Sequence, residues 1–348
     1  VLLDLMLPDR SGLDLLPDIK EFDPHLPVVV ITAYSSVESA IEAMRRGAFH
    51  YVPKPFKNEE VLHLVRRAFE RRALLVENLE LRNRLEGLGE IVGTSRRIEE
   101  VFELMRRAAP ARSTILVVGE SGTGKELVAR AIHRLSPRGD GPFVPVHTTA
   151  IPADLLESTL FGHVKGAFTG AVSSRKGLFE AAHNGTLFLD EVGTISSETQ
   201  TKLLRVIQER EIRRVGSVEA KAIDTRLVAA TNTDLWQEVQ EGNFREDLYY
   251  RLNVITIEMP PLRERREDIP LLATHFLRKF SEENQREIEG FSSHVMDALS
   301  DYHWPGNVRE LENAIERAVV LCRGDSIEVA ELPQSVRGDP SSTIAPKV

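Results

Sequence analysis

Short apolar segments alternate with helical stretches over the first part of the chain. Residues 1–4 are apolar up to a final carboxylate, and residues 28–31 form a β-branched run between a proline and a threonine. A helical stretch with a serine start and a terminal glycine fills residues 36–47, and a third strand is expected around Val52. Because alternating strands and helices predict a parallel sheet, residues 1–72 are assigned to a doubly wound α/β domain.

A second series of strands begins after Glu90. Each segment is short and apolar, and helical stretches separate them, which predicts another parallel sheet flanked by helices. The predicted strands cover residues 114–118, 143–146, 186–189, 226–230 and 254–257. We therefore expect an α/β domain at residues 91–262.

The pattern becomes helical after Pro260 and Pro261. Three helices are expected, at residues 268–283, 292–302 and 307–321. The last begins at Asn307 with Glu310 three residues later, which is typical of a capped helix start. These helices predict a helical domain at residues 263–335, and residues 336–348 are typical of a linker tail.

One long helix is predicted for residues 58–88. Within it, a seam at alternating spacings of four and three residues is formed by Leu74, Asn78, Leu81, Leu85 and Leu88. Such a seam, with asparagine at one core position, is typical of a short coiled coil between two copies of a chain. The alternative is an amphipathic linker packed on its own domain, because the seam covers barely two heptads. Residues 73–90 are assigned to a helical linker, with the dimer favoured.

Composition sets limits on the class of protein. The 348 residues are 42% hydrophobic and 28% charged, as in ordinary globular proteins, and suffice for two or three domains. The formal net charge of −9 argues against nucleic-acid binding over the whole surface. No apolar run is long enough to span a bilayer. The one cysteine, Cys322, fits a small core position in a reducing compartment, so a cytoplasmic location is expected.

The glycine-rich segment after the strand at residues 114–118 has the pattern of a phosphate-binding loop. It consists of Gly119, Glu120, Ser121, Gly122, Thr123, Gly124, Lys125 and Glu126. In such a loop, between a strand and a helix, backbone N–H groups cradle phosphates and the lysine reaches the β and γ groups. Glu126 stands where the general pattern has serine or threonine for Mg²⁺. The alternative is a glycine-rich turn without nucleotide, which the strand, loop and helix together disfavour.

Two carboxylates, Asp190 and Glu191, follow the apolar strand at residues 186–189. In phosphoryl-transfer sites one such group holds Mg²⁺ and another positions the attacking water. We therefore predict Asp190 as the metal ligand and Glu191 as the water-positioning group. An exposed acidic turn is the alternative, and a phosphate loop upstream makes it less favoured.

Between these two segments lies a hexapeptide of mostly small residues. It consists of Gly166, Ala167, Phe168, Thr169, Gly170 and Ala171. Glycine and alanine let the backbone bend and approach another molecule closely, while Phe168 and Thr169 form a tip with one ring and one hydroxyl. Alone, the segment would be an ordinary flexible loop. Between the two halves of a nucleotide site, it is typical of a loop that ATP turnover moves.

The hexapeptide resembles the signature of the bacterial enhancer-binding activators, the AAA+ ATPases that act on sigma-54 RNA polymerase. The phosphate loop, with its glutamate after the lysine, also has the usual form of that family, and the resemblance covers most of the chain. It implies that residues 166–171 contact sigma-54, that Asn232 senses the γ-phosphate and that Arg309 reaches the nucleotide from a helical lid. It also implies ATP and Mg²⁺ as cofactors, with Val92 and Gly93 near the adenine.

Arg245 and Arg251 stand six residues apart, upstream of the last predicted strand. This spacing does not share one helix face, so a common helix surface does not explain the pair. In the family both arginines act in trans, on ATP bound by the neighbouring subunit. The resemblance therefore implies a homo-oligomer, from a dimer to a hexameric ring.

Two positions differ from the family pattern. His147 replaces the usual asparagine, the switch residue that holds the catalytic glutamate in an inactive pose, although histidine can also hydrogen-bond a carboxylate. Val164 stands just before the hexapeptide, where glutamate is common. Because neither change removes a phosphate or metal contact, we expect them to affect the timing of turnover more than its existence.

Three polar side chains, Asp4, Thr32 and Lys54, follow the predicted strands of the first domain. Ligands bind at the carboxyl ends of strands in open α/β sheets, so one shared site is a hypothesis, with unrelated loop residues as the alternative. The surrounding sequence resembles the second half of a response-regulator receiver domain. The resemblance implies phosphorylation of Asp4 by a sensor histidine kinase, with Thr32 as switch hydroxyl, Tyr51 as switch aromatic and Lys54 as phosphate-binding lysine. The Mg²⁺-holding acidic pair of that family would precede Val1.

The expected fold is α/β: a partial receiver, then an AAA+ P-loop ATPase with an α/β subdomain and a helical lid. The predicted function is an ATP-hydrolysing transcriptional activator that remodels the sigma-54 RNA polymerase closed complex, controlled by receiver phosphorylation in a two-component system. The alternatives are an AAA+ ATPase of another class, such as a chaperone or helicase loader, and a nucleotide-binding regulator without turnover. Enhancer DNA would be bound only through a domain that the family carries after the lid.

Overall fold

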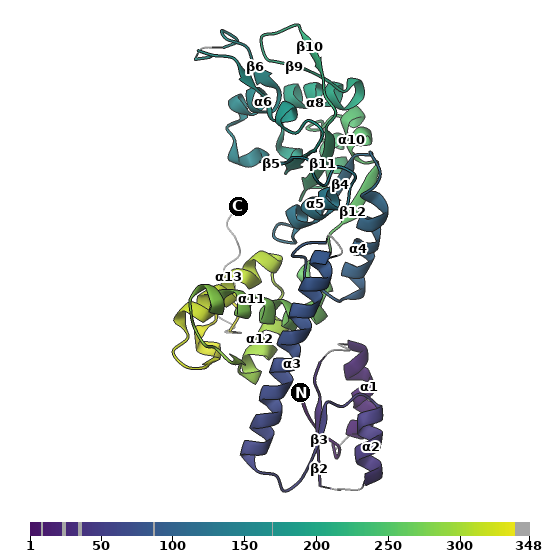
Figure 1. Cartoon of the computed structure of the whole chain (residues 1–348), viewed down its shortest axis with the longest axis vertical. Coiled ribbons are helices and arrows are strands. Elements are labelled where there is room, and N and C mark those ends of the chain that lie inside the picture. Colours follow the sequence, from purple (N-terminus) through teal and green to yellow (C-terminus); the bar gives the residue numbers. More distant parts are fainter. Residues whose placement is uncertain (8–9, 23–25, 34–36, 86–87, 169, 338–348) are drawn as a thin grey trace. The chain divides into compact units, whose positions relative to one another are not determined.

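The computed structural model describes residues 1–7, 10–22, 26–33, 37–85, 88–168 and 170–337 (Figure 1). The chain forms two compact units, each made of more than one segment. The first contains Val1–Leu81, Arg266–Tyr302 and the chain from Glu312 onward, and the second contains Arg82–Arg265 and His303–Leu311. No helix among the described residues has the length and apolar character needed to cross a membrane.

The second unit is built on a five-stranded sheet in which every strand pair is parallel. The strand order is β12-β4-β11-β8-β5. The strands are β4 (Ile115–Val118), β5 (Phe143–His147), β8 (Thr186–Asp190), β11 (Arg226–Thr231) and β12 (Ile255–Glu258). Each predicted strand is confirmed to within one residue at either end. Because the strands share one direction, their carboxyl ends line one edge of the sheet.

Helices cover both faces of this sheet, since alternate strand residues point to opposite sides. Val117 and Phe188 lie in one hydrophobic core, while their neighbours Leu116 and Leu187 lie in the other. The first core is completed by α4 (Arg96–Ala108) and α5 (Lys125–Arg134). The helices of the second core are α6 (Ala153–Phe161), α7 (Leu178–Ala181), α8 (Ser197–Glu209), α9 (Leu235–Gln240) and α10 (Glu246–Leu252). Burial of each large apolar side chain contributes about 1.5–3 kcal/mol, which is why these strands are nearly continuous apolar runs.

Two small antiparallel strand pairs gather at one end of this unit (Figure 1). They are β6 (Gly162–His163) with β7 (Arg175–Lys176), and β9 (Glu211–Arg213) with β10 (Ala220–Ala222). The pairs are joined through Val215, whose N–H donates to Gly162 and whose carbonyl accepts from Val164. A Cβ atom at Gly216 would lie 2.8 Å from the Ala167 Cβ. The turn between β9 and β10 therefore lies directly against the loop between β6 and β7.

A buried carboxylate fixes the hairpin of β9 and β10. The Glu180 side chain is 2% exposed and accepts hydrogen bonds from Arg214 Nε at 2.8 Å and Lys221 Nζ at 2.5 Å. The hydrogen bonds from Arg214 are the main reason why the pKa of Glu180 falls to about 2, and those from Lys221 add to them. The hairpin is thus tied to α7 by two ion pairs that share one buried carboxylate.

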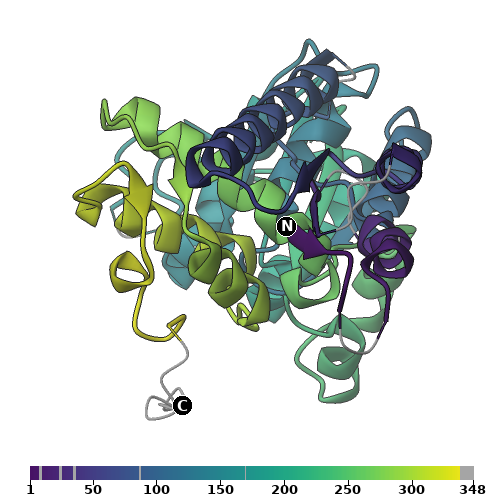
Figure 2. The ribbon, with the colours of Figure 1, turned by 90° about the horizontal axis from the view of Figure 1, so that it is seen from below.

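In the first unit, residues 1–53 form a parallel sheet of order β1-β2-β3. Its elements are β1 (Leu2–Asp4), α1 (Gly12–Phe22), β2 (Val29–Thr32), α2 (Val37–Arg45) and β3 (His50–Pro53). The two helices cover one face (Figure 2), where Leu16 and Ala43 pack on Leu3 and Val30. The predicted α/β domain is confirmed, and Ser36, the predicted start of its second helix, lies outside the described residues.

The long helix α3 (Asn58–Leu85) ends before the last predicted seam position. Leu88 lies beyond the helix and is fully buried in the first core of the second unit, so its assignment to the seam was wrong. Leu74 and Leu81 are 65% and 51% exposed, and Asn78 is exposed as well. The side chain of Leu85 lies outside what the structure describes. The coiled-coil dimer stays a prediction that rests on the three exposed positions.

The remaining elements of the chain are helical with short strands. They are η1 (Thr148–Ala150), η2 (Val192–Thr194), η3 (Leu262–Glu264), η4 (Arg266–Asp268), α11 (Ile269–Glu283), β13 (Gly290–Phe291), α12 (Ser293–Asp301), α13 (Asn307–Leu321), β14 (Ser326–Ile327) and η5 (Val329–Glu331). The three helices predicted after Pro261 are therefore confirmed. Cys322 is buried directly after α13, as predicted, and its Sγ lies 3.3 Å from the Gly324 oxygen.

We expect Glu180→Gln to lower the free energy of unfolding at neutral pH by up to about 3 kcal/mol, given the fall in pKa from 4.5 to about 2. Because the folded pKa is the lower one, this stabilisation is present above about pH 4.5 and is lost as the pH falls toward 2. Urea denaturation between about pH 7 and pH 3 should show a difference from the parent protein that shrinks with pH. The matched control is Glu211→Gln, an exposed carboxylate of β9. A difference that does not change with pH would contradict the assignment.

Candidate nucleotide site

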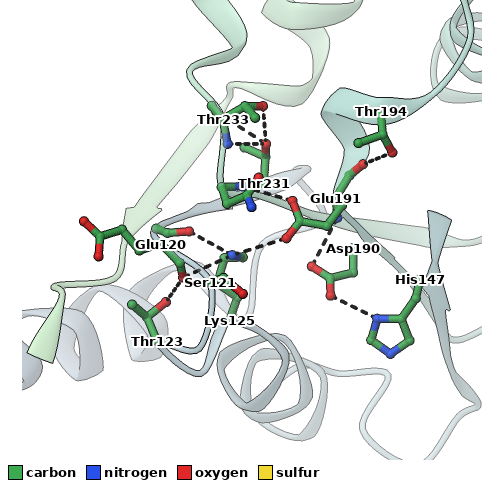
Figure 3. Close-up of polar contacts among 12 residues, drawn as sticks. Glu120, Ser121, Thr123, Lys125, His147, Asp190, Glu191, Thr194, Thr231 and Thr233 are labelled. Atoms are coloured by element: carbon green, nitrogen blue, oxygen red, sulfur yellow. Dashed lines mark hydrogen bonds and ion pairs between the residues drawn. The ribbon is translucent and has the colours of Figure 1, made fainter. Parts of the chain in front are cut away.

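The predicted phosphate loop lies between β4 and α5, at the carboxyl edge of the sheet (Figure 3). Gly122 and Gly124 have left-handed φ angles of 80° and 99°, which favour glycine. A side chain at Gly122 would also collide with the chain, because its Cβ would lie 2.3 Å from the Gly306 oxygen. The loop opens onto the first turn of α5, where free N–H groups and the helix dipole favour an anion.

Lys125 places a buried cation inside this loop. Its side chain is 7% exposed. Nζ donates to the backbone carbonyl oxygen of Gly119 at 2.8 Å and to that of Glu120 at 3.3 Å. Nζ also lies 3.7 Å from Oε1 of Glu191 (Figure 3). The structure therefore brings together the lysine and the acidic group that the sequence placed on separate motifs.

The two acidic residues leave the end of β8 in different directions. Oδ2 of Asp190 lies 3.0 Å from Nδ1 of His147, at the end of β5. Glu191 has a left-handed φ of 57° and turns toward β11, where Oε2 accepts a hydrogen bond from the backbone N–H of Asn232 at 3.2 Å. Asp190 thus faces β5, while Glu191 faces Lys125 and β11, which separates the two predicted roles in space.

His147 hydrogen-bonds Asp190, and the described residues include no bond from it to Glu191. The implied switch contact to the water-positioning glutamate is therefore not made here. Strand register explains this, because His147 is the direct partner of Asp190 across β5 and β8, and Glu191 lies one residue beyond. Nε2 of His147 is 3.8 Å from Oε2 of Glu126, whose Oε1 accepts from Arg130 on the same helix.

Sequence reasoning missed the residues that hold the phosphate loop from its other side. The Glu120 carboxylate accepts hydrogen bonds from Arg263 Nη1 and Nη2 at 2.8 and 2.6 Å, and from Asn307 Nδ2 at 3.0 Å. The bonds from Arg263, followed by the bond from Asn307, lower the pKa of Glu120 to about 2. Arg265, 2% exposed, donates to the Thr123 oxygen. These neighbours engage the Glu120 side chain, and the predicted place of Glu120 in the ATP-binding loop stays a prediction. No local pattern marks the pair with Arg263, since 143 residues separate the two.

Asn307 also has a different role from the predicted helix cap. It is fully buried, its Nδ2 donates to the Ser121 oxygen at 3.0 Å, and its Oδ1 accepts from the Leu262 N–H at 2.8 Å. The cap prediction was wrong because the side chain joins two other segments. Glu310 instead accepts from the Gly306 N–H at 2.8 Å, which closes the start of α13.

Arg309 reaches the phosphate loop, as its position in the predicted lid implied. Its Nη1 donates to Ser121 Oγ at 3.2 Å. The backbone N–H groups of Val308 and Arg309 both donate to the Gly122 oxygen, at 3.1 and 3.3 Å. The N-terminal turn of α13 is therefore bonded directly to the loop that would hold the phosphates.

The remaining predicted nucleotide contacts lie elsewhere in the second unit. Val92 and Gly93 are buried in the segment before α4, and their role at the adenine stays a prediction. Arg245 precedes α10 and pairs with Asp247 at 2.7 Å, and Arg251 lies in the last turn of α10. Both arginines are exposed, and the described residues show no polar contact from either to the phosphate loop of the same chain. The role of both arginines in trans stays a prediction.

The hexapeptide lies on the loop between β6 and β7. The Gly166 N–H donates to the Ala171 oxygen at 2.9 Å, which closes the loop on itself. Phe168 is 39% exposed, and its ring centre lies 5.1 Å from that of His163 in an edge-on arrangement. Thr169 lies outside the described residues. Val164, the other departure from the family pattern, is held by its backbone bond to Val215.

The polar residues of the first unit meet at the carboxyl edge of its small sheet. Lys54 Nζ lies 2.5 Å from Oδ2 of Asp4, and this bond is the main cause that lowers the pKa of Asp4. Thr32 is buried at the end of β2, between the strands that lead to the other two. Tyr51 lies on β3, with its hydroxyl 3.5 Å from Ser39 Oγ. The unrelated-loop alternative is thus excluded for Asp4 and Lys54, which form one ion pair.

Three sequence families match successive parts of the chain. Residues 1–66 match the response regulator receiver domain, residues 91–258 the sigma-54 interaction domain, and residues 263–347 the AAA+ ATPase lid domain. The predicted domain limits at 72, 90, 262 and 335 stay predictions, since the family matches place the domains without fixing their ends. Together with the sheet order and the phosphate loop, these matches define an AAA+ ATPase that follows a receiver.

Relatives with curated functions match nearly the whole chain. The transcriptional regulatory protein ZraR of Salmonella typhimurium is 48% identical over 343 residues, which cover 99% of this chain and 77% of ZraR. The DNA-binding transcriptional regulator NtrC of Proteus hauseri is 45% identical over 337 residues, covering 97% of this chain and 71% of NtrC. The crystal structure of NtrX from Brucella abortus in complex with ATP is similar with a TM-score of 0.66 and 38% identity, covering 97% of this chain and 74% of NtrX.

The chain belongs to the sigma-54-dependent response regulators, which combine a receiver with an AAA+ activation domain. The predicted fold and the predicted function as a sigma-54-dependent ATPase of a two-component system are confirmed. The matches do not support the alternative of another AAA+ class, because the sigma-54 interaction domain covers the whole α/β part of the ATPase.

We expect Asn307→Gly to lower the free energy of unfolding by about 2–4 kcal/mol and to weaken ATP binding, because it removes three hydrogen bonds that a buried side chain makes around the phosphate loop. Glycine retains the left-handed φ of 52°. Urea denaturation and a fluorescence titration with ATP measure the two effects. Asn184→Gly, at an exposed residue with a φ of 61°, is the matched control and should change neither quantity by a comparable amount. Equal effects of the two substitutions would show that the bonds of Asn307 do not support the loop.

Proposed function

We propose that this chain hydrolyses ATP with Mg²⁺ as cofactor, within a ring of identical subunits, and uses loop 166–171 to remodel the sigma-54 RNA polymerase closed complex. The observation that carries the proposal is the position of this loop. It is presented on the β6–β7 pair with Phe168 half exposed, in the same compact unit as the phosphate loop and the acidic pair. An exposed ring on a short, closed loop is suited to a contact with another protein.

Lys125 would bind the β and γ phosphates, because its buried charge lies at the start of α5 within the loop. Glu191 would orient the attacking water. Its position between Lys125 and the Asn232 N–H supports this role, since it lies next to the groups that would surround the γ-phosphate. Arg309 would report the nucleotide to the lid through the Ser121 side chain that it already contacts.

Asp190 would hold Mg²⁺, which neutralises charge on the β and γ phosphates when it is bound. Among the described residues, no three acidic, histidine or cysteine side chains gather to hold a metal. This fits Mg²⁺, which is usually held by one or two carboxylates together with phosphate oxygens and water. His147 would orient Asp190 toward the metal, because Nδ1 already binds one of its oxygens.

Arg245 and Arg251 would complete the site of a neighbouring subunit. Both are exposed on the short helix α10 or at its start, and an arginine supplied in trans can be worth ~10³–10⁵ in rate. Arg245 would exchange its pair with Asp247 for the neighbour's phosphate. The exposed positions Leu74, Asn78 and Leu81 on α3 would add a dimer contact.

Phosphorylation of Asp4 by a sensor histidine kinase would control this ATPase. The Lys54 ammonium next to Asp4 would bind the phosphoryl oxygens, and Thr32 and Tyr51 would respond as switch residues. The cytoplasm, where sigma-54 RNA polymerase acts, is the expected location.

The contact role of the loop is tested with Phe168→Ala and Thr169→Ala. Both should keep most of the ATPase activity and lose sigma-54 binding and open-complex formation, because neither residue contacts phosphate or metal in the proposed mechanism. ATP hydrolysis, a pull-down with sigma-54 in the presence of an ATP transition-state mimic, and transcription from a sigma-54 promoter measure the three properties. Val172→Ala, at a residue 79% exposed just after the hexapeptide, is the control. A Phe168 variant that still opens promoters normally would refute the proposal.

The trans arrangement is tested by mixing two inactive proteins. Glu191→Ala should retain ATP binding and lose hydrolysis. Arg251→Ala should lose hydrolysis because no subunit of its ring supplies this arginine to the site of the next subunit. In mixed rings, the intact arginine of the first protein can serve the intact site of the second, so hydrolysis should partly return. Mass photometry establishes that rings have formed. No recovery at any mixing ratio in such rings would count against an arginine acting in trans.

A further inference from the structure

A polar pocket of the second unit lies at the amino edge of the five-stranded sheet, where β4 and β11 begin. Its volume is about 330 Å³. Its lining includes five arginines, Arg112, Arg138, Arg210, Arg226 and Arg251. Among the described residues of the lining, Asp224 is the one acidic side chain. The arginines come from five separate segments of the chain, so no sequence motif marks this pocket.

The charges of the pocket act on one another. Arg138 Nη2 donates to Asp224 Oδ1 at 2.5 Å, and Nη1 donates to the Asp224 carbonyl oxygen at 2.9 Å. This bond is the main cause that lowers the pKa of Asp224, and the charges of Arg112 and Arg210 act in the same direction. One carboxylate therefore sits among several guanidinium groups, and the pocket retains a surplus of positive charge that repels itself.

Arg226 lines the pocket and is the most buried of its five arginines, with one donor unpaired among the described residues. It is 3% exposed, and its Nη1 and Nη2 atoms donate to the carbonyls of Ala109 and Ala108 at the end of α4. Its Nε is buried without a hydrogen-bond partner among the described residues. A buried donor of this kind is destabilising unless an acceptor is supplied, and more so when it is charged. An anion in the pocket would offset the repulsion among the arginines, and the exposed guanidinium groups of Arg112 and Arg210 could donate to it.

We propose that this pocket binds a compact oxyanion, namely a phosphate or diphosphate group. Guanidinium groups bind phosphate oxygens through parallel N–H···O bonds, and a volume of about 330 Å³ lies at the small end of ligand pockets. The phosphate has two possible sources. One is a free inorganic anion. The other is a nucleotide held by a second copy of the chain. Arg251, which is proposed above to act in trans, also lines this pocket. This second source therefore rests on the proposed ring.

Calorimetric titration with pyrophosphate tests the site, in the full chain carrying Lys125→Ala so that the phosphate loop is disabled. We expect one saturable site whose affinity falls about tenfold or more in Arg210→Asn and Arg112→Gln, since each loses a charge-assisted hydrogen bond. Both side chains are exposed, and asparagine tolerates the left-handed φ of 55° at Arg210, so the fold should be retained. Arg205→Gln, at an exposed arginine of α8 outside the pocket, carries the same change of charge and should leave the affinity unchanged. No saturable binding, or equal losses in the Arg205 and Arg210 variants, would overturn the proposal.

A second titration separates the two sources of phosphate. It uses Glu191→Ala protein saturated with ATP, whose phosphate loops are occupied, after ring formation is measured by mass photometry. Pyrophosphate binding that persists in these rings identifies a free anion as the ligand. Binding that disappears only when rings form identifies the neighbour's nucleotide. If no ring forms, the proposed trans mechanism fails, while the first titration still decides whether the pocket binds an oxyanion.

Discussion

Because β8, β11 and β4 lie side by side and run in one direction, the groups that follow them meet at one edge of the sheet. Lys125 follows β4, Glu191 follows β8 and Asn232 follows β11, and the bonds among them join three segments far apart in the chain. In an antiparallel arrangement, neighbouring strands would end at opposite edges and these groups would separate. The nucleotide site is thus a consequence of sheet topology, and the apolar burial on both faces that stabilises the sheet also stabilises the site.

The phosphate loop is held from two sides. Within the loop, Lys125 Nζ donates to the backbone carbonyls of Gly119 and Glu120. From the chain after β12, Arg263 donates to the Glu120 carboxylate and Asn307 donates to the Ser121 carbonyl. The loop also accepts two backbone bonds from the first turn of α13. A change of loop conformation must therefore move or break bonds to α13, which gives a direct physical link between the nucleotide and the start of that helix.

A short stretch of chain connects the neighbourhood of the acidic pair to loop 166–171. His147 binds Asp190, and the hydroxyl of Thr148 donates to the carbonyls of Asp190 and Glu191. From there the chain passes through α6 to β6 and loop 166–171. The β9–β10 hairpin lies against the same loop and is anchored by the buried Glu180. His147 therefore lies at the start of the segment that connects the neighbourhood of the acidic pair to loop 166–171.

The sequence by itself determined the strands and helices, the phosphate loop and the acidic pair, since these depend on local apolar periodicity, on glycine at left-handed positions and on residues adjacent in the chain. It also determined the family, through a hexapeptide that needs no tertiary context to be recognised. Tertiary structure alone decided which partners the polar groups take. His147 meets Asp190 through strand register, Leu88 joins the core of the second unit, and Glu120 pairs with Arg263 across 143 residues. The arginine pocket likewise forms only when five segments converge. Local sequence fixes the conformation of each segment, whereas contacts between distant side chains depend on how the sheet and helices pack, and no local pattern encodes that packing.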